Sequence, residues 1–362
     1  MFMSNKNYNP NIAIHPGETL RDLLQTIEMS QIDLAKRVDL TPKTINRIIK
    51  GNDPITSETA IRLSAVFGMS ASFWNNLQMN YERTLTRLRF QKQLNAELPY
   101  LRKFQCYSEL SKLGYVKNTK DAKERVISLL HLFGVKSLSL IPSIDVYSVA
   151  FRKSKHKKND ICQESLAAWL RCGEIEAKKV PLKKFDRHKL KNTLVAIRRL
   201  TKEQVSVSQN KLIEICASCG VAVVFVPYFK QTYVNAATRW LSPDKAVIQA
   251  SLKSMRVDGF WFSFFHELKH LLDCKKKEQF IDFEDIEGGD VCKKADEFAR
   301  DILIPKLEFA KFKSENVFSD IAIKKFANKL GIDYSIVAGR LSYEEQDYKK
   351  WDHLRKKLEW VS

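Results

Sequence analysis

No uninterrupted apolar run in the sequence is long enough to cross a membrane. The longest such runs, Val221–Pro227 and Phe260–Phe265, fall far short of the roughly 20 residues that a membrane-spanning helix needs. The first residues, MFMSNKNYNPN, also lack the basic-then-apolar order of a secretion signal. These absences argue against a secreted or membrane protein, and we expect a cytoplasmic protein with no membrane partner.

Cysteine is scarce, with seven residues scattered over a chain of 362. An odd number without a secretion signal indicates reduced thiols rather than a disulfide framework. Cys216 and Cys219 have zinc-knuckle or redox spacing, but no second Cys or His pair stands at a matching distance. They lie in a stretch with the pattern of an apolar helix, which favours core packing over metal or redox chemistry.

Charge is abundant but unevenly placed. The composition is globular, with 44% hydrophobic and 28% charged residues, and the net charge is +19. Residues 1–80 and 203–362 each carry a net charge of +1, whereas residues 81–202 carry 28 basic and 11 acidic side chains. Such a field attracts polyanions, so we expect a second nucleic-acid contact through this basic middle. A solvated surface or an acidic protein partner is the alternative.

Residues 11–80 have the pattern of short helices joined by tight turns. Ser30 and Thr41 are candidate N-caps of two helices, over about 31–38 and 43–50, and Ser57 and Thr59 open another. Pro42 suits the first turn of the second helix and Gly51 suits its end. The apolar residues expected to share one core are Leu34, Val38, Leu40, Ile45 and Ile48. This is helix-turn-helix patterning.

The second helix of this unit would present polar side chains to DNA. The candidate DNA-binding residues are Gln31, Thr41, Lys43, Thr44, Asn46, Arg47 and Lys50. Side chains of these types bond to phosphate oxygens and to base edges. The alternative is a small helical bundle with a polar face, but the succession of cap, turn and cap favours DNA binding.

Several short motifs in this region belong together. They are His15-Pro-Gly-Glu18, Met29-Ser-Gln31, Leu34-Ala35, Thr44–Gly51, Ile55-Thr56, Glu58-Thr-Ala60, Arg62-Leu63 and Phe73–Leu77. Over residues 12–82 the sequence thereby resembles the HigA-type antitoxin and transcription regulator family. The resemblance implies that a homodimer binds palindromic operator DNA, and it is compatible with a toxin partner.

The region after residue 200 has the pattern of a small sheet followed by a chemically informative helix. Strands are expected over Val221–Pro227, Ala236–Leu241 and Ala246–Ser251, in a mixed or antiparallel sheet. The motif His266-Glu-Leu-Lys-His270 follows. On a helix both histidines project from one face and can share a metal, with Glu267 placed as a general base. The alternative is a core helix whose histidines are incidental.

A zinc ion held by two histidines needs a third protein ligand. The sequence continues with an acidic stretch, Phe280–Glu287, which we expect to be a loop, and then with an amphipathic helix over 293–305. Asp296 and Glu297 are the early carboxylates of that helix and are the candidate further ligands.

These segments carry a second resemblance. Ala236–Ala246, Phe260–His270 and Ala295–Pro305 resemble the ImmA/IrrE metallo-endopeptidase family, with coverage of about residues 160–342. The resemblance implies a zincin-like fold and a zinc-dependent peptidase that cleaves a repressor protein in a stress or mobile-element response. It also implies that His266 and His270 bind Zn²⁺ and that Glu267 is the catalytic base.

Two departures from the family pattern affect the site. Lys269 stands where the family has glycine, and Lys294 stands where it has the third-ligand glutamate. Glu297 lies one helical step along the same face from position 294 and could serve instead, and Asp296 is a second candidate. The alternative is an inactive site in a fold that senses or binds a partner.

We therefore expect a mainly helical α+β protein. Its parts are an all-α helix-turn-helix domain (11–82), a basic helical middle (83–202), a zincin-like domain with a small sheet (203–342) and a helical tail (343–362). Within the third part, residues 321–341 repeat the helix-turn-helix pattern with few cations and are expected to pack on the peptidase-like fold. The expected function is an operator-binding regulator that cleaves a protein, with a non-enzymatic HigA-like antitoxin and autorepressor as the alternative.

Overall fold

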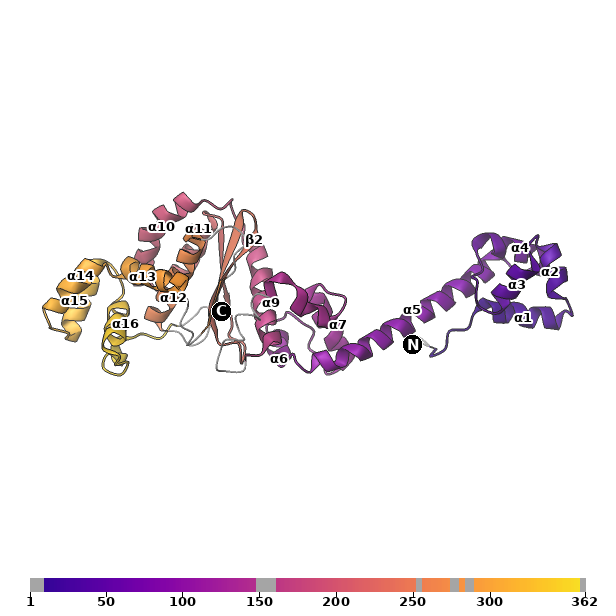
Figure 1. Ribbon diagram of the computed structural model, residues 1–362, viewed down its shortest axis with the longest axis horizontal. Helices are drawn as coiled ribbons and strands as arrows, with labels where there is room; N and C mark the ends of the chain where they lie inside the picture. Colours follow the sequence, from indigo (N-terminus) through magenta and orange to yellow (C-terminus); the bar gives the residue numbers. More distant parts are fainter. Residues whose placement is uncertain (1–9, 148–160, 252–255, 274–279, 284–289, 359–362) are drawn as a thin grey trace, which may run out of the picture. The chain divides into compact units, whose positions relative to one another are not determined.

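The chain folds into two compact units, Met1–Leu98 and Pro99–Ser362. The computed structural model describes residues 10–147, 161–251, 256–273, 280–283 and 290–358 (Figure 1). The expected domain boundary between residues 82 and 83 falls inside one long helix, α5 (Ala71–Leu101). The basic run at residues 152–158 lies outside the described residues.

The N-terminal unit is built from four short helices and all but the last turn of α5. The helices are α1 (Pro16–Thr26), α2 (Gln31–Arg37), α3 (Pro42–Ile49) and α4 (Ser57–Phe67). Their shared core contains Leu34, Val38, Ile45 and Ile48, as expected, with Leu40 packed at its edge. At Gly17 a Cβ atom would lie 2.0 Å from the carbonyl oxygen of Ile48, so only glycine allows α1 to approach α3 this closely.

The C-terminal unit is organised around a mixed sheet of four strands in the order β1-β3-β2-β4. The strands are β1 (Val221–Val226), β2 (Val234–Ser242), β3 (Lys245–Ser251) and β4 (Phe280–Phe283). β1 runs parallel to β3, whereas β2 runs antiparallel to both β3 and β4. The three expected strands are confirmed. The expected acidic loop at 280–287 is wrong in part, because residues 280–283 pair with β2 as a strand.

Helices cover both faces of this sheet (Figure 1). Ahead of the sheet come α6 (Tyr107–Lys112), α7 (Ala122–Phe133), α9 (Gln163–Lys179), α10 (Arg187–Arg199) and α11 (Val205–Ala217). Ala222 and Val224 of β1 share a cluster with Ala177 of α9, while Val221 and Val223 pack with α11 and the helices that follow the sheet. Alternate β1 residues thus face opposite helical layers. The expected boundary at residues 202 and 203 falls inside this shared core.

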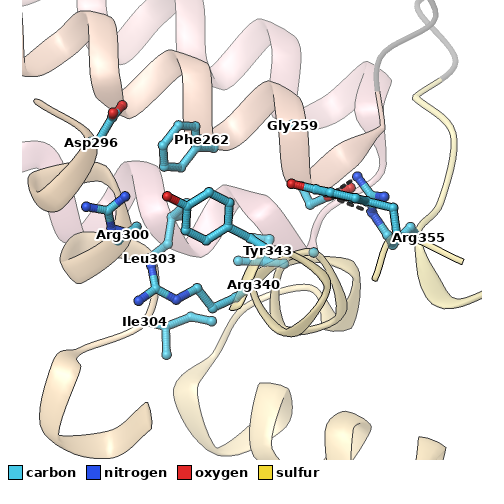
Figure 2. A pocket seen from close by; sticks show the side chains of 13 residues that line it. Gly259, Phe262, Asp296, Arg300, Leu303, Ile304, Arg340, Tyr343 and Arg355 are labelled. Carbon is cyan, nitrogen blue, oxygen red and sulfur yellow. Dashed lines mark hydrogen bonds and ion pairs between the residues drawn. The ribbon is translucent and has the colours of Figure 1, made fainter. Parts of the chain in front are cut away.

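The helices after β3 carry the histidine motif and enclose a cavity. They are α12 (Val257–Asp273), α13 (Asp290–Leu303), α14 (Lys306–Ser314), α15 (Asp320–Leu330) and α16 (Tyr334–Glu345). Residues 321–341 form most of α15 and of α16; α15 packs on α16, and α16 packs on α12. At Gly339 of α16 a Cβ atom would lie 2.2 Å from Asp258 of α12, so the two helices are in close contact. A cavity lies between α12, α13 and α16 (Figure 2).

Three further expectations about local structure are corrected. The stretch Glu109–Leu132, whose apolar period predicts one helix, instead forms parts of two helices, α6 and α7, separated by a turn at Gly114. The N-cap of α4 is Thr56, whose hydroxyl accepts from the backbone N–H of Thr59. The helical tail expected over 343–362 is helical only as far as Glu345, the end of α16. Beyond it the described residues are largely irregular, with one short 3₁₀ turn, η3 (Asp352–Leu354). Burial of Trp351, Leu354 and Leu358 produced the misleading periodicity.

One segment, Ala122–Ser143, is long and apolar enough to cross a membrane by length and composition alone. It is not one helix, because α7 ends at Gly134 with φ of 66° and the 3₁₀ turn η1 (Leu138–Ser143) follows. Val126, Leu129 and Leu130 are buried in the fold. The segment has the properties of a core helix followed by a turn.

Candidate nucleic-acid interface and candidate metal centre

The helix pair α2–α3 is fixed by side-chain caps at both starts. Ser30 accepts from the backbone N–H of Asp33 at 3.1 Å, and Thr41 accepts from that of Thr44 at 3.1 Å. Pro42 occupies the first turn of α3, where its missing N–H costs nothing. The turn itself is held by Arg62 of α4, which donates to the carbonyl oxygens of Val38 and Asp39 at 3.0 and 2.6 Å.

The predicted DNA-binding residues lie on the outer side of this pair. Exposed residues among them are Gln31, Thr41, Lys43, Arg47 and Lys50, while Thr44 and Asn46 are half-buried. Thr41 is committed to the cap, and its hydroxyl also lies 2.9 Å from that of Thr44. The cationic side chains Lys43 and Lys50 are therefore the freest of the set to reach phosphates.

Arg47 is already engaged within the free protein. Its Nε and Nη2 each donate to a carboxylate oxygen of Asp53 at 2.6 Å, a bidentate pair in which both groups face solvent. The hydrogen bond lowers the pKa of Asp53 and raises the pKa of Arg47. The pair orients the guanidinium beside the end of α3 and places an acidic group there, which the sequence pattern did not indicate.

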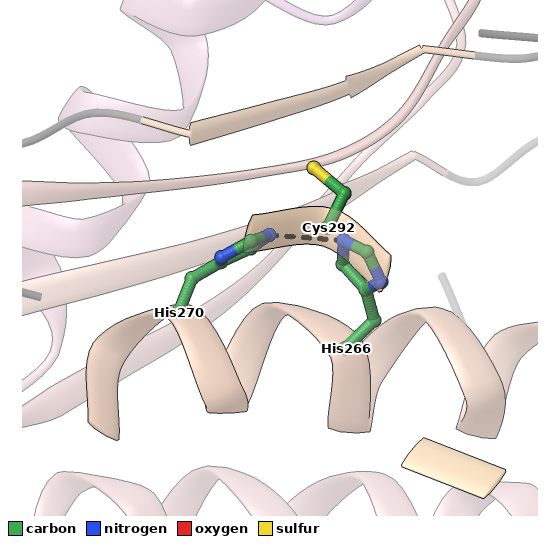
Figure 3. Close-up of side chains that lie close together, drawn as sticks. All are labelled: His266, His270 and Cys292. Atoms are coloured by element: carbon green, nitrogen blue, oxygen red, sulfur yellow. Dashed lines mark hydrogen bonds between the residues drawn. The ribbon is translucent and has the colours of Figure 1, made fainter. Parts of the chain in front are cut away.

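In the C-terminal unit, α12 and α13 bring three metal-ligating side chains together: His266, His270 and Cys292 (Figure 3). One ligand atom from each lies within 4.8 Å of the others. The Nε2 atoms of His266 and His270 are 2.9 Å apart. Two nitrogens bound to one tetrahedral zinc at about 2.0–2.1 Å would lie about 3.3 Å apart, so a small adjustment of the rings accommodates the ion.

Asp296 fixes the orientation of His266. Its Oδ1 lies 2.7 Å from His266 Nδ1, and since an ionised carboxylate can only accept, Nδ1 carries the proton. The lone pair of the ring is then on Nε2, the atom that faces His270. A carboxylate on the far nitrogen of a ligating histidine is the usual outer contact of protein zinc sites. Asp296 thus orients His266 and does not itself belong to the cluster of His266, His270 and Cys292.

Other residues of the predicted site lie elsewhere. Glu297 is exposed and is outside the group of three. Lys294, at the position where the family has its third ligand, is exposed as well, so its charge does not enter the cluster. Lys269 is paired with Asp273 at 2.9 Å. Glu267 is fully buried, with 0% exposure, next to His266 in the sequence.

Cys292 is the residue that the sequence analysis missed. It precedes Asp296 by four positions on α13, so both side chains lie on the helix face that meets α12. A cysteine four positions before Asp296, next to the start of the predicted helix, could have been recognised from the sequence as a candidate ligand, because Cys and His are the ligands that zinc prefers. Cys216 and Cys219, in contrast, are fully buried in the core, as expected, and burial raises the pKa of the Cys216 thiol.

Comparisons with known proteins fall on a limited part of the chain. The helix-turn-helix family model matches residues 20–74. Virulence-associated protein I of Dichelobacter nodosus is 42% identical over 78 residues, which are 21% of this chain and 70% of that protein. An uncharacterized HTH-type transcriptional regulator, YddM of Escherichia coli (strain K12), is 35% identical over 63 residues, 17% of this chain and 67% of that protein.

Solved structures of antitoxins are similar to this chain over about a quarter of its length. The antitoxin HigA of Pseudomonas aeruginosa, solved with the higBA promoter, is 37% identical and covers 24% of this chain and 95% of its own, with a TM-score of 0.23. A HigA-family antidote protein from Coxiella burnetii is 35% identical, covers 24% and 94%, and has a TM-score of 0.22. Through its N-terminal unit, this chain belongs to the family of helix-turn-helix transcriptional regulators.

Proposed function

We propose that this protein is a transcriptional regulator that binds operator DNA through α3. The observation that carries the proposal is the geometry of α2–α3, a capped helix pair whose outer side exposes Lys43 and Lys50. The proposal draws support from the relative solved with its promoter. A homodimer on a palindromic site, and a toxin partner as in the related antitoxins, are parts of the same proposal.

The test is selection of duplexes from a random DNA library by the full-length protein. We expect enrichment of a palindromic sequence, as a two-fold symmetric dimer of this class requires. Fluorescence anisotropy then compares the selected duplex with a scrambled one. If no sequence is enriched, or if both duplexes bind equally well, operator binding is wrong.

The second part of the proposal concerns the C-terminal unit, where a specific cluster favours a metal centre. His266, His270 and Cys292 would hold Zn²⁺, and Asp296 would keep His266 in the ligating tautomer. Zinc, when bound in such a site, supplies Lewis-acid activation of water. Glu267, which follows His266 on α12, would accept the proton, and the substrate would be a repressor or another partner protein. The basic middle would add a sequence-independent contact to nucleic acid.

The rival function for this unit is sensing or partner binding without hydrolysis. The variant Glu267→Gln separates the two, because it removes the base and leaves His266, His270 and Cys292 in place. We expect new protein N-termini in cells with the wild-type protein and none that depend on it in cells with Glu267→Gln. If the two strains yield the same N-termini while the purified proteins hold equal zinc, the peptidase proposal is rejected and the zinc centre is retained.

A further inference from the structure

The cavity between α12, α13 and α16 measures about 260 Å³. Its wall combines an apolar surface with the three arginines Arg300, Arg340 and Arg355 (Figure 2). Two half-exposed tyrosines, Tyr343 and Tyr348, also line it. The volume is below the roughly 300–1,000 Å³ of pockets for drug-sized ligands, so the ligand that fits is small. Apart from Asp296, no residue that lines this cavity has a role in the functions considered above.

Two of the arginines have donor groups that the described carboxylates do not engage. Arg300 of α13 lies over the ring of Tyr343 at 5.8 Å and makes no ion pair with any carboxylate that the structure describes. Arg340 of α16 pairs through Nη2 with Glu344 at 2.6 Å. Its Nη1 atom is buried and has no hydrogen-bond partner among the described residues. Burial lowers the pKa of Arg340, and the charge of Arg300 adds to this effect.

The acidic residues of the cavity wall are each committed to another partner. Asp258 accepts from Nε and Nη2 of Arg355 at 2.9 and 2.8 Å. Asp296 accepts from His266. The cavity therefore holds two arginine groups that these carboxylates leave available: the guanidinium of Arg300 and the buried Nη1 of Arg340. A buried donor without an acceptor costs free energy that a bound anion would recover.

The rest of the cavity wall is apolar, and a glycine, Gly259, leaves space beside it unfilled. Phe262, Leu303, Ile304 and Ile336 line it. A Cβ atom at Gly259 would meet no described heavy atom within 4 Å, so this position opens onto the free space of the cavity. We propose that the cavity binds a small organic anion, a carboxylate or phosphate on a compact apolar body, with Arg300 and Arg340 holding the anionic group.

The proposal is tested on the full-length protein with benzoate and phenyl phosphate as anionic probes. Inorganic phosphate tests the anionic group alone, and benzyl alcohol supplies a neutral ring of similar size. Binding is measured by isothermal titration at constant ionic strength and millimolar probe. We expect at least one ring-bearing anion to bind and benzyl alcohol not to bind. The ratio of benzoate to phenyl phosphate affinity distinguishes a carboxylate from a phosphate ligand.

Two variants and two matched controls locate the site. Arg300→Gln should weaken the binding of the anionic probe by about tenfold or more, because it removes a charge-assisted contact. Gly259→Leu should abolish binding by filling the cavity. Gly259→Ala and Arg199→Gln, the latter an exposed arginine that does not line the cavity, should bind nearly as the wild type does. Circular dichroism checks that each variant is folded.

The proposal is overturned if no anionic probe binds to the wild type, or if benzyl alcohol binds as well as the anions do. It is also overturned if folded Arg300→Gln and folded Gly259→Leu both retain wild-type affinity. If Gly259→Leu fails to fold, the comparison of Arg300→Gln with Arg199→Gln decides alone, since both remove one positive charge.

Discussion

His266 and Asp296 join the two helices that build the candidate metal centre. The imidazole Nδ1 of His266 on α12 lies 2.7 Å from the carboxylate of Asp296 on α13. This contact fixes which nitrogen of His266 carries the proton and directs its other nitrogen toward His270 and Cys292. The orientation of His266 in the motif on α12 therefore depends on a residue from a second helix, some 30 positions along the chain.

Metal binding by the purified protein tests whether Cys292 is the third ligand. Cys292→Ser should lose the thiolate-to-metal charge-transfer absorption of the cobalt-substituted protein, which a carboxylate ligand would not produce. Asp296→Asn should weaken zinc affinity by about 10–100-fold, the usual effect of losing an outer contact. Glu297→Ala is the matched control and should bind zinc like the wild type, because its side chain is exposed. A normal cobalt spectrum in Cys292→Ser would contradict the assignment.

Alkylation gives an independent measure of the same ligand. Burial raises the pKa of the Cys106 thiol to about 12, so this residue should resist iodoacetamide in the folded protein. Cys162 and Cys292 are half-buried and should react faster. Added zinc should slow the alkylation of Cys292 and leave Cys162 unaffected, which makes Cys162 the internal control. Peptide mass spectrometry after timed alkylation measures each site, and equal protection of both residues would speak against a zinc ligand at 292.

Substitutions in and next to α3 should affect the affinity for DNA and the preferred sequence separately. Lys43→Ala and Lys50→Ala should each weaken binding to the selected duplex and reduce the salt slope by about one unit, as expected for a lost phosphate contact. Asn46→Ala should alter the preferred sequence more than the salt slope, since amide side chains read base edges. Arg21→Ala on α1 removes a charge that is already next to Asp22 and serves as the control. Anisotropy at several salt concentrations measures all four, and unchanged slopes for Lys43→Ala and Lys50→Ala would refute the placement.

A pair of helical glycines tests the packing of the C-terminal unit. At Gly173 of α9 a Cβ atom would lie 1.8 Å from the amide oxygen of Gln249, a buried side chain that also donates to the carbonyl of Trp169. Gly173→Ala should therefore lower the free energy of unfolding by about 1–3 kcal/mol. Gly259→Ala, where the added methyl has room, should raise it by about 0.5–1 kcal/mol. Urea denaturation measures both, and equal changes would contradict the close contact at Gln249.

Stability in acid should depend on Glu174 of α9. Burial raises the pKa of Glu174, but hydrogen bonds from Arg171 and Lys178, each at 2.7 Å, outweigh it and hold the pKa below its ordinary value. The folded state therefore binds this proton less readily than the unfolded state does. The stabilisation is present above the ordinary glutamate pKa and is lost as the pH falls through the lowered pKa.

Glu174→Gln should flatten this acid limb in urea denaturation between neutral pH and the onset of acid unfolding. Glu214→Gln on α11 is the control, because its exposed side chain makes no ion pair with any described residue. If Glu174→Gln and the wild type lose stability in parallel as the pH falls, the ion pairs do not account for the acid sensitivity.

The sequence by itself determined the local structure of both candidate sites. The caps at Ser30 and Thr41, the proline at residue 42 and the apolar period fix α2 and α3, because these signals act over three or four residues. The same holds for α12, where the spacing of His266 and His270 follows from helical geometry alone.

Only the tertiary structure decided what meets those helices. Asp296 faces His266, Glu297 faces solvent, and Cys292 completes the cluster, because the rotation of α13 against α12 is set by burial of Ala295 and Ala299. The pairing of Arg47 with Asp53 and the meeting of Arg300 with Arg340 at one cavity are of the same kind. Such contacts join residues between 6 and 40 positions apart, and local periodicity carries no information about which faces of two helices meet.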